Sequence, residues 1–155
     1  MGQDWDEIYV KIKGKWKYLY RAVDEAGQTI DFLFTTQRDG AAARRFLKKA
    51  IRHHGLPDKI ILDKSGVNRV AIDSYNAEHE ASIEIRQIKY LNNLVEQDHR
   101  AIKRIIRSML GFKSCRSAEI TLSGIELMHV IKKGQMTTAD SQPLSAAEQL
   151  YALAA

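Results

Sequence analysis

The sequence predicts an α/β fold in which helices flank a mixed five-stranded sheet. Two patterns support this prediction. Three alternating runs separated by tight turns open the chain, which is typical of an antiparallel meander. Helical and extended segments then alternate, which favours further strands joined in parallel with helices packed on the sheet. A length of 155 residues is sufficient for one domain with its own core.

The meander occupies the first part of the chain. The predicted strands are residues 6–13, 16–23 and 29–35, with turns at 13–15 and 24–27. In the first strand, alternate residues share one face. These are Asp6, Ile8, Val10 and Ile12.

Four helices and two strands are predicted after the meander. Asp39 is expected to cap a helix that runs to about His54 and stops at Gly55. The remaining elements are a strand at 59–63, a helix at about 67–79, a strand at about 83–88, a helix from Asn92 or Asn93 to about Met109, and a helix at about 114–133. This order is that of a ribonuclease H-like fold. We predict one ribonuclease H-like domain over residues 1–135 and a partly helical tail over 136–155.

Two apolar stripes identify the inner faces of the last two helices. The first comprises Val95, Ile102, Ile105, Ile106 and Met109. The second comprises Leu122, Ile125, Leu127, Met128 and Ile131.

Composition limits the class of protein. The formal net charge of +5 favours an anionic partner, although many basic proteins bind no specific anion. The single cysteine, Cys115, excludes an internal disulfide, and we expect a reducing cytoplasm as the compartment. No apolar run approaches the ~20 residues that a membrane helix needs, so no membrane partner is predicted.

Three carboxylates are the candidate functional residues. Asp6 opens the first strand, Asp63 ends the apolar run 59–63, and Glu96 lies on a predicted helix. Carboxylates at two strand ends and on one helix are a ligand set for two divalent metals that act on phosphodiesters. Each of them, taken alone, is more typical of a solvated surface group, and only the sequence around the three favours a metal site.

The amino-acid sequence around these carboxylates resembles that of the DDE-type transposases of insertion-sequence family six. Residues 6–24, Asp-Glu-Ile-Tyr-Val-Lys-Ile-Lys-Gly-Lys-Trp-Lys-Tyr-Leu-Tyr-Arg-Ala-Val-Asp, are similar to the first catalytic block of that family. Ile-Leu-Asp-Lys-Ser-Gly at 61–66 resembles the second block, and residues 88–104, which contain Asn-Asn-Leu-Val-Glu-Gln-Asp-His-Arg, resemble the third. Residues 109–114 and 124–135 are similar to the C-terminal part of the family.

The resemblance implies a function. Asp6, Asp63 and Glu96 would be the catalytic, metal-binding triad, holding two Mg²⁺ ions, with Mn²⁺ as a substitute. The reaction would be cleavage of DNA at transposon ends and transfer of the freed 3′ end to target DNA. The partners would be DNA and further copies of the chain in a homo-oligomer on DNA.

The resemblance also implies that Lys103 is a basic partner of the triad, seven residues after Glu96. Residues seven apart lie on one helical face, and Arg100 and Arg107 continue the same stripe. We therefore predict that Lys103, Arg100 and Arg107 bind DNA phosphates. The alternative is a solvated helix face in which Lys103 pairs with Glu96 or a neighbour, which is worth about 0.2–0.5 kcal/mol.

Two basic clusters would suit a DNA track. Residues 11–21 hold Lys11, Lys13, Lys15, Lys17 and Arg21, and residues 99–116 hold six further Lys or Arg, with no acidic residue in either range. The aromatic residues Trp16, Tyr18 and Tyr20 interleave with the first cluster. The competing interpretation, which we favour, places these aromatics in the core and the lysines on the opposite strand face.

The chain differs from the sequence pattern of this family at two positions and at its start. Ile8 stands where the family usually has Thr, and Cys115 stands where an aromatic residue is usual. The family's helix-turn-helix region is not present before Asp6, so we expect a truncated gene. Two other hypotheses remain: an inactive transposase remnant that only binds DNA or pairs with an intact copy, and a cellular ribonuclease H-like nuclease.

Overall fold

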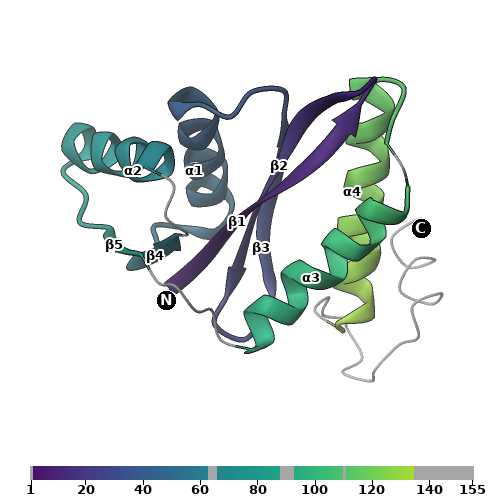
Figure 1. The fold of residues 1–155 in the computed structure, drawn as a ribbon. Helices are drawn as coiled ribbons and strands as arrows, with labels where there is room; N and C mark the ends of the chain where they lie inside the picture. The colour runs from purple at the N-terminus through teal and green to yellow at the C-terminus, as the bar shows by residue number, and fades with distance from the viewer. Residues whose placement is uncertain (1, 63–65, 88–92, 110, 135–155) are drawn as a thin grey trace.

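Five strands and four helices make up the part of the chain that the computed structural model describes, residues 2–62, 66–87, 93–109 and 111–134 (Figure 1). The strands are β1 (Gly2–Ile12), β2 (Lys15–Asp24), β3 (Thr29–Thr35), β4 (Lys59–Leu62) and β5 (Glu84–Gln87). The helices are α1 (Gly40–His54), α2 (Gly66–His79), α3 (Asn93–Ser108) and α4 (Cys115–Lys132).

The strands form one mixed sheet in the order β3-β2-β1-β4-β5. β1, β2 and β3 pair in antiparallel fashion, whereas β1–β4 and β4–β5 pair in parallel. The predicted five-stranded mixed sheet is therefore confirmed. In this register, Asp6 lies opposite Arg21 on β2, and Asp4 lies opposite Ile61 on β4.

Local signals in the sequence account for the turns and helix ends. Lys13 and Gly14 both adopt positive φ (49° and 78°), which lets a tight turn join β1 to β2. The Asp39 carboxylate accepts a hydrogen bond from the Ala42 N–H at 2.8 Å and caps α1, as predicted. Gly55, with φ 82°, ends α1, also as predicted.

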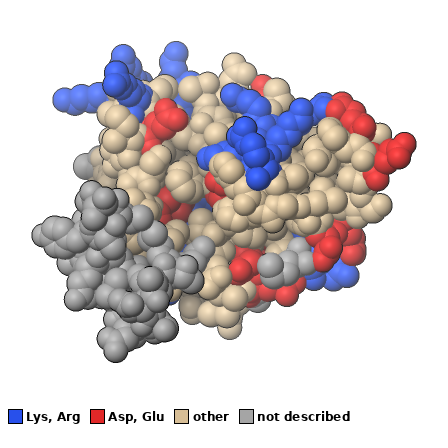
Figure 2. Space-filling view, turned by 180° about the vertical axis from the view of Figure 1, so that it is seen from behind, with Lys and Arg blue, Asp and Glu red and all other residues tan. Residues whose placement is uncertain are grey.

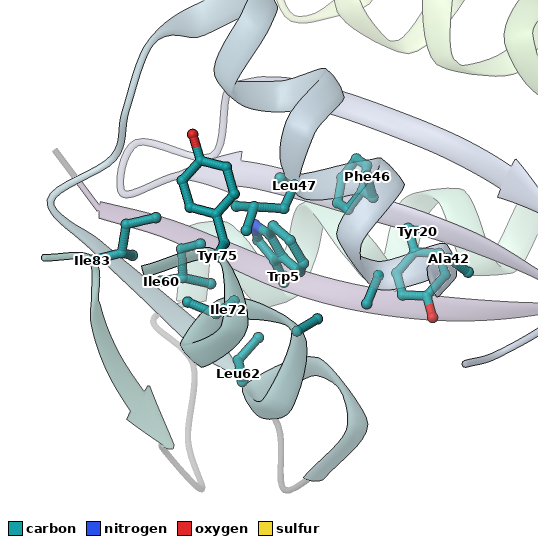
Figure 3. Close-up of a cluster of buried hydrophobic side chains, with 13 residues drawn as sticks. Trp5, Tyr20, Ala42, Phe46, Leu47, Ile60, Leu62, Ile72, Tyr75 and Ile83 are labelled. Carbon is teal, nitrogen blue, oxygen red and sulfur yellow. The ribbon is translucent and has the colours of Figure 1, made fainter. Parts of the chain in front are cut away.

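Each face of the sheet carries its own core. On one face, α1 and α2 cover a cluster that includes Trp5, Tyr20, Phe46 and Ile72 (Figure 3). The Trp5 and Phe46 rings lie 4.7 Å apart at their centroids. On the other face, α3 and α4 cover a second cluster of buried residues: Ile8, Val10, Ile12, Leu19, Ile102, Ile106, Ala118 and Leu122. The alternation of β1 thus points Asp6 toward α3.

Some predicted details are wrong. β1 begins at Gly2, so Asp6 lies in the middle of a strand instead of opening it. The predicted inner stripes are too wide, because Ile105, Leu127 and Met128 are 39%, 40% and 41% exposed. The tail predicted over 136–155 lies outside the described residues. Among the residues that are described, no helix combines the length and apolarity needed to cross a membrane.

Candidate active site

Asp6 is held at the interface between β1 and α3. Lys103 Nζ on α3 lies 2.8 Å from Asp6 Oδ2, and His99 Nδ1 lies 4.0 Å from the same oxygen. Asp6 Oδ1 accepts a hydrogen bond from the Glu7 N–H at 2.9 Å. The Asp6 side chain is 20% exposed, so its carboxylate is fixed by neighbours while remaining reachable from solvent.

Glu96 lies on the same helix, nearer its start. Its carboxylate pairs with Arg100 one turn later, and both side chains are more than half exposed, at 51% and 62%. Lys103 pairs with Asp6 and not with Glu96, so the alternative of an ion pair between Lys103 and Glu96 within the helix is wrong. Arg107 is exposed one further turn along α3. Glu96, Lys103 and Arg107 follow one another at helical spacing along one side of α3.

Asp63 lies outside the described residues. The last residue of β4 is Leu62, and Ile61 is the β4 residue paired with Asp4 of β1. Among the residues for which the structure gives positions, no group of three His, Cys, Asp or Glu side chains is arranged to hold a metal ion.

The chemistry of Asp6 nevertheless fits a divalent cation. Its Oδ2 atom already faces a positive charge, the Lys103 ammonium, at 2.8 Å. A carboxylate oxygen that solvent can reach is the hard oxygen donor that Mg²⁺ prefers, and the Lys103 ammonium would have to move aside for the metal ion. The second predicted ligand in the described part of the chain, Glu96, is an exposed carboxylate on the helix that packs against Asp6.

A buried ionic network lies directly behind this site. Arg21, opposite Asp6 on β2, is fully buried and makes two hydrogen bonds to Glu126 of α4, one from Nε and one from Nη2 (3.1 Å). Its Nη2 also lies 2.9 Å from Asp98 Oδ2, and its Nη1 donates to His99 Nδ1 at 2.9 Å. Burial lowers the pKa of the Arg21 guanidinium, but the charges and hydrogen bonds of Glu126 and Asp98 together outweigh burial and raise it.

The network joins β2, α3 and α4. Asp98 also contacts His129 Nε2 and Lys133 Nζ, each at 2.7 Å. Burial raises the pKa of Asp98, yet the hydrogen bonds from His129 and Lys133 and the charge of Arg21 hold it well below its usual value. Burial lowers the pKa of His99 to about 4, so this ring is neutral at pH 7 and accepts from Arg21.

Sequence analysis missed this network and placed Arg21 wrongly. Arg21 is 0% exposed, so it cannot belong to a DNA-facing cluster with Lys11 and Lys13. A signal was available, because Arg21 has the same strand parity as the buried Leu19 and Val23. Glu126 likewise falls four residues after Leu122, on the inner side of α4.

A second polar contact holds the other face of β1 beside Asp6. The Glu7 carboxylate pairs with Arg38 and accepts a hydrogen bond from Asn68 Nδ2 of α2 at 2.6 Å. Glu7 is therefore neutralised by Arg38 and does not add a free negative charge next to the site.

Basic side chains gather in patches on the face of the molecule that α1 covers (Figure 2). Figure 2 shows two groups of Lys and Arg on the face seen from behind. One of them overlies α1, whose basic residues are Arg44, Arg45, Lys48, Lys49 and Arg52. The basic residues of α1 were not singled out from the sequence, because the same residues flank the apolar stripe of an ordinary amphipathic helix.

Comparison with known proteins decides the family. Residues 2–135 match the sequence profile of the DDE domain of transposases. The chain belongs to the DDE-domain transposases. It is 42% identical over 129 residues to the transposase for insertion sequence-like element IS431mec and to the transposase for insertion sequence element IS257 in transposon Tn4003, both of Staphylococcus aureus. These matches cover 83% of this chain and 56% of each relative, so the chain spans about half the length of these transposases.

Solved structures support the fold. The DDE domain of this chain superposes on the HTLV-2 integrase catalytic core domain in complex with magnesium with a TM-score of 0.61, 15% identity, and coverage of 90% of this chain and 88% of that one. The catalytic core domain of BIV integrase gives a TM-score of 0.60 at 11% identity, covering 99% and 95%. The predicted ribonuclease H-like fold is confirmed.

Proposed function

We propose that this DDE domain is the catalytic core of a transposase that cleaves DNA at the ends of an insertion sequence and joins the freed 3′ end to target DNA. The observation that carries the proposal is the contact of Asp6 with α3, through Lys103 at 2.8 Å and His99 at 4.0 Å. That contact sets the strand of one predicted ligand against the helix that bears another, Glu96.

Asp6, Asp63 and Glu96 are the proposed ligands of two Mg²⁺ ions, with Mn²⁺ as a substitute. Bound there, the ions would activate the attacking oxygen and stabilise the leaving oxygen. Two facts favour Asp63 as the partner of Asp6. Ile61 pairs with Asp4 in the parallel register, and the two aspartates lie two residues beyond these two positions in the chain.

The other residues of the site are proposed to hold the metal ligands in place and to bind the charged phosphates of DNA. The network of Arg21, Asp98 and Glu126 ties α3 and α4 to β2, which fixes the distance between Asp6 and the α3 residues. Lys103, Arg100 and Arg107 are the proposed phosphate contacts along α3. Because phosphate contacts position DNA without reading its sequence, these three residues would not by themselves recognise the transposon ends. The proposed partners are DNA and further copies of the chain. The single exposed cysteine is compatible with work in the reducing cytoplasm.

The test is cleavage and strand transfer on plasmid DNA with Mg²⁺ or Mn²⁺. It would use this chain alone and this chain joined to the N-terminal part of a full-length relative. Asp6→Asn, Asp63→Asn and Glu96→Gln should each abolish the reaction while the far-ultraviolet circular dichroism stays unchanged. Asp73→Asn, which changes an exposed carboxylate on α2, is the matched control and should retain activity.

Two results would overturn parts of this proposal. Full activity in any one of the three carboxylate variants would remove that residue from the catalytic set. DNA binding without any cleavage by the joined protein would instead favour the inactive-remnant hypothesis.

A further inference from the structure

A groove of about 520 Å³ lies next to Asp6, between β1 and the second half of α3. Its lining includes Tyr9, Lys11 and Trp16 from the β1–β2 hairpin and Lys103 and Arg107 from α3. Lys103 belongs both to this groove and to the ion pair with Asp6. The groove therefore adjoins the proposed catalytic carboxylate through Lys103 and extends along the β1–β2 hairpin.

The fold leaves this groove open for a specific reason. Among the described residues, β4 pairs with β1 only as far as Asp4, so the rest of that edge of β1 has no strand beside it except a bridge between Ile12 and Phe112. That bridge is held by the Phe112 N–H, which donates to the Lys11 carbonyl at 2.8 Å. Gly111, with φ 109°, permits the approach, because a Cβ there would lie 3.3 Å from the Lys11 carbonyl oxygen.

Aromatic rings are exposed at the groove, which is unusual for residues of their size. Trp16 is 56% and Tyr9 53% exposed. The Tyr9 ring lies 6.2 Å from Trp16 and 5.6 Å from Tyr18, so the three rings form one cluster on the hairpin. The expectation that Trp16 is a core residue is therefore wrong.

The exposure follows from where the helices stop covering the sheet. Trp5 and Tyr20 are covered by α1, and both belong to the buried cluster on that face. Tyr9 and Trp16 lie further along the hairpin, beyond that cluster. Nothing in the packing of the described residues requires two large rings at this surface.

Positive charge surrounds the rings. Lys11 Nζ lies 5.5 Å from the Trp16 ring centroid, and Lys103 and Arg107 line the opposite wall. The one acidic residue of the lining, Glu7, is already paired with Arg38. The groove therefore combines exposed aromatic faces with three basic side chains, one of which, Lys103, is shared with Asp6. Aromatic faces beside positive charge are the composition that binds single-stranded nucleic acid.

We propose that this groove holds single-stranded DNA, with an unpaired base stacked on Trp16 and Tyr9 and the adjoining phosphates on Lys11, Lys103 and Arg107. The bases of an intact duplex are stacked on one another and cannot present their faces to a tryptophan, so the groove selects frayed or unpaired DNA. The inference deepens the proposed function, on which it rests for the identity of the ligand as DNA. It adds that strands are separated next to the scissile phosphate.

The test compares the affinity of the protein for a single-stranded oligonucleotide with its affinity for a duplex of the same sequence. Fluorescence anisotropy measures both affinities, in Ca²⁺ or without metal. Trp16→Ala and Tyr9→Ala should each weaken binding of the single strand by about 10-fold or more, and binding of the duplex by less than about 2-fold. Trp16→Phe, which keeps a ring, should restore most of the affinity. Ile120→Ala, which removes an exposed apolar side chain on α4, is the matched control.

Two further measurements separate stacking from charge. The slope of log affinity against log salt should be unchanged in Trp16→Ala, because stacking releases no counterions. Binding of the single strand should also quench the intrinsic fluorescence, since Trp16 is exposed while the other tryptophan, Trp5, is 3% exposed. This quenching should vanish in Trp16→Phe.

Equal loss of single-strand and duplex affinity in Trp16→Ala, or no loss, would overturn the inference. A shift of the sedimentation coefficient by Trp16→Ala without DNA would also overturn it, because the groove would then be covered by a second copy of the chain. Neither result bears on catalysis, which the carboxylate variants test separately. Loss of catalysis in Asp6→Asn together with unchanged binding by Trp16→Ala would leave the proposed function standing and remove the groove from it.

Discussion

Lys103 reaches across the interface between α3 and β1 and places its ammonium group 2.8 Å from the carboxylate of Asp6. A partly exposed lysine beside a proposed metal ligand can exchange partners, because its four-carbon side chain is flexible. Lys103 would then leave Asp6 for a DNA phosphate when a metal ion occupies the carboxylate.

Lys103→Ala should weaken DNA binding about equally for unrelated sequences, because phosphate contacts carry no sequence information. The slope of log affinity against log salt should fall by roughly 0.9, the change expected for the loss of one phosphate contact on duplex DNA. Filter binding at several salt concentrations measures both quantities. Lys103→Arg keeps the charge and should keep the slope. An unchanged slope in Lys103→Ala would remove Lys103 from the DNA-binding residues.

Replacing Mg²⁺ by Ca²⁺ should preserve DNA binding and abolish strand cleavage. Ca²⁺ takes more oxygen ligands at longer distances, so it can neutralise the carboxylates without holding the compact geometry that phosphoryl transfer requires. Binding and nicking measured on the same DNA, in the same buffer, with one ion exchanged for the other provide the test. Cleavage with Ca²⁺ at the rate found with Mg²⁺ would contradict the proposed metal chemistry.

Much of the fold was predictable because strand and helix periodicity is local. The meander, the Asp39 cap and the Gly55 stop all depend on residues close together in the chain, and the structure contains each of them. Alternation also placed Asp6 on one strand face with Ile8 and Val10, and the structure shows that α3 and α4 cover this face.

The buried network was not predictable in the same way, because its partners come from three separate elements. A charged residue such as Arg21 resembles a surface group until Glu126 and Asp98 are brought to it. The exposure of the aromatic side chains was not predicted either, because it depends on where a helix stops covering the sheet. Alternation predicts which face of β2 Trp16 occupies, but not that α1 ends before it can cover that ring.

Arg21→Met should destabilise the protein by about 3–5 kcal/mol. The substitution leaves the buried Glu126 carboxylate without its cationic partner and removes one of the cationic partners of Asp98. The midpoint of urea unfolding at neutral pH measures the change. Adding Glu126→Leu to Arg21→Met should recover part of the loss, since the unpaired buried charge is then removed. Arg69→Met, which breaks an exposed pair with Asp73, should cost less than about 1 kcal/mol. A cost for Arg21→Met no larger than that of Arg69→Met would contradict a stabilising role of the network.

Asp4 gives a prediction for the dependence of stability on pH. Its side chain is 3% exposed in total, and Oδ2 is buried without a hydrogen-bond partner. Burial, followed by the charge of Glu25, raises the pKa of Asp4 from 3.8 to about 6. Between these two values the folded protein retains a proton that the unfolded chain has lost, so this residue makes the protein less stable as pH rises from about 4 to about 6.

Asp4→Asn should therefore stabilise the metal-free protein at pH 7.5 by about 2–3 kcal/mol, the free-energy equivalent of the pKa shift. The gain should shrink toward zero near pH 4, where Asp4 is protonated in the folded state. Urea unfolding of both proteins at several pH values between 4 and 8 measures the difference. Asp73→Asn, at an exposed site on α2, should show no such trend. A stabilisation of Asp4→Asn that is constant across this range would show that the folded protein does not hold the extra proton on Asp4.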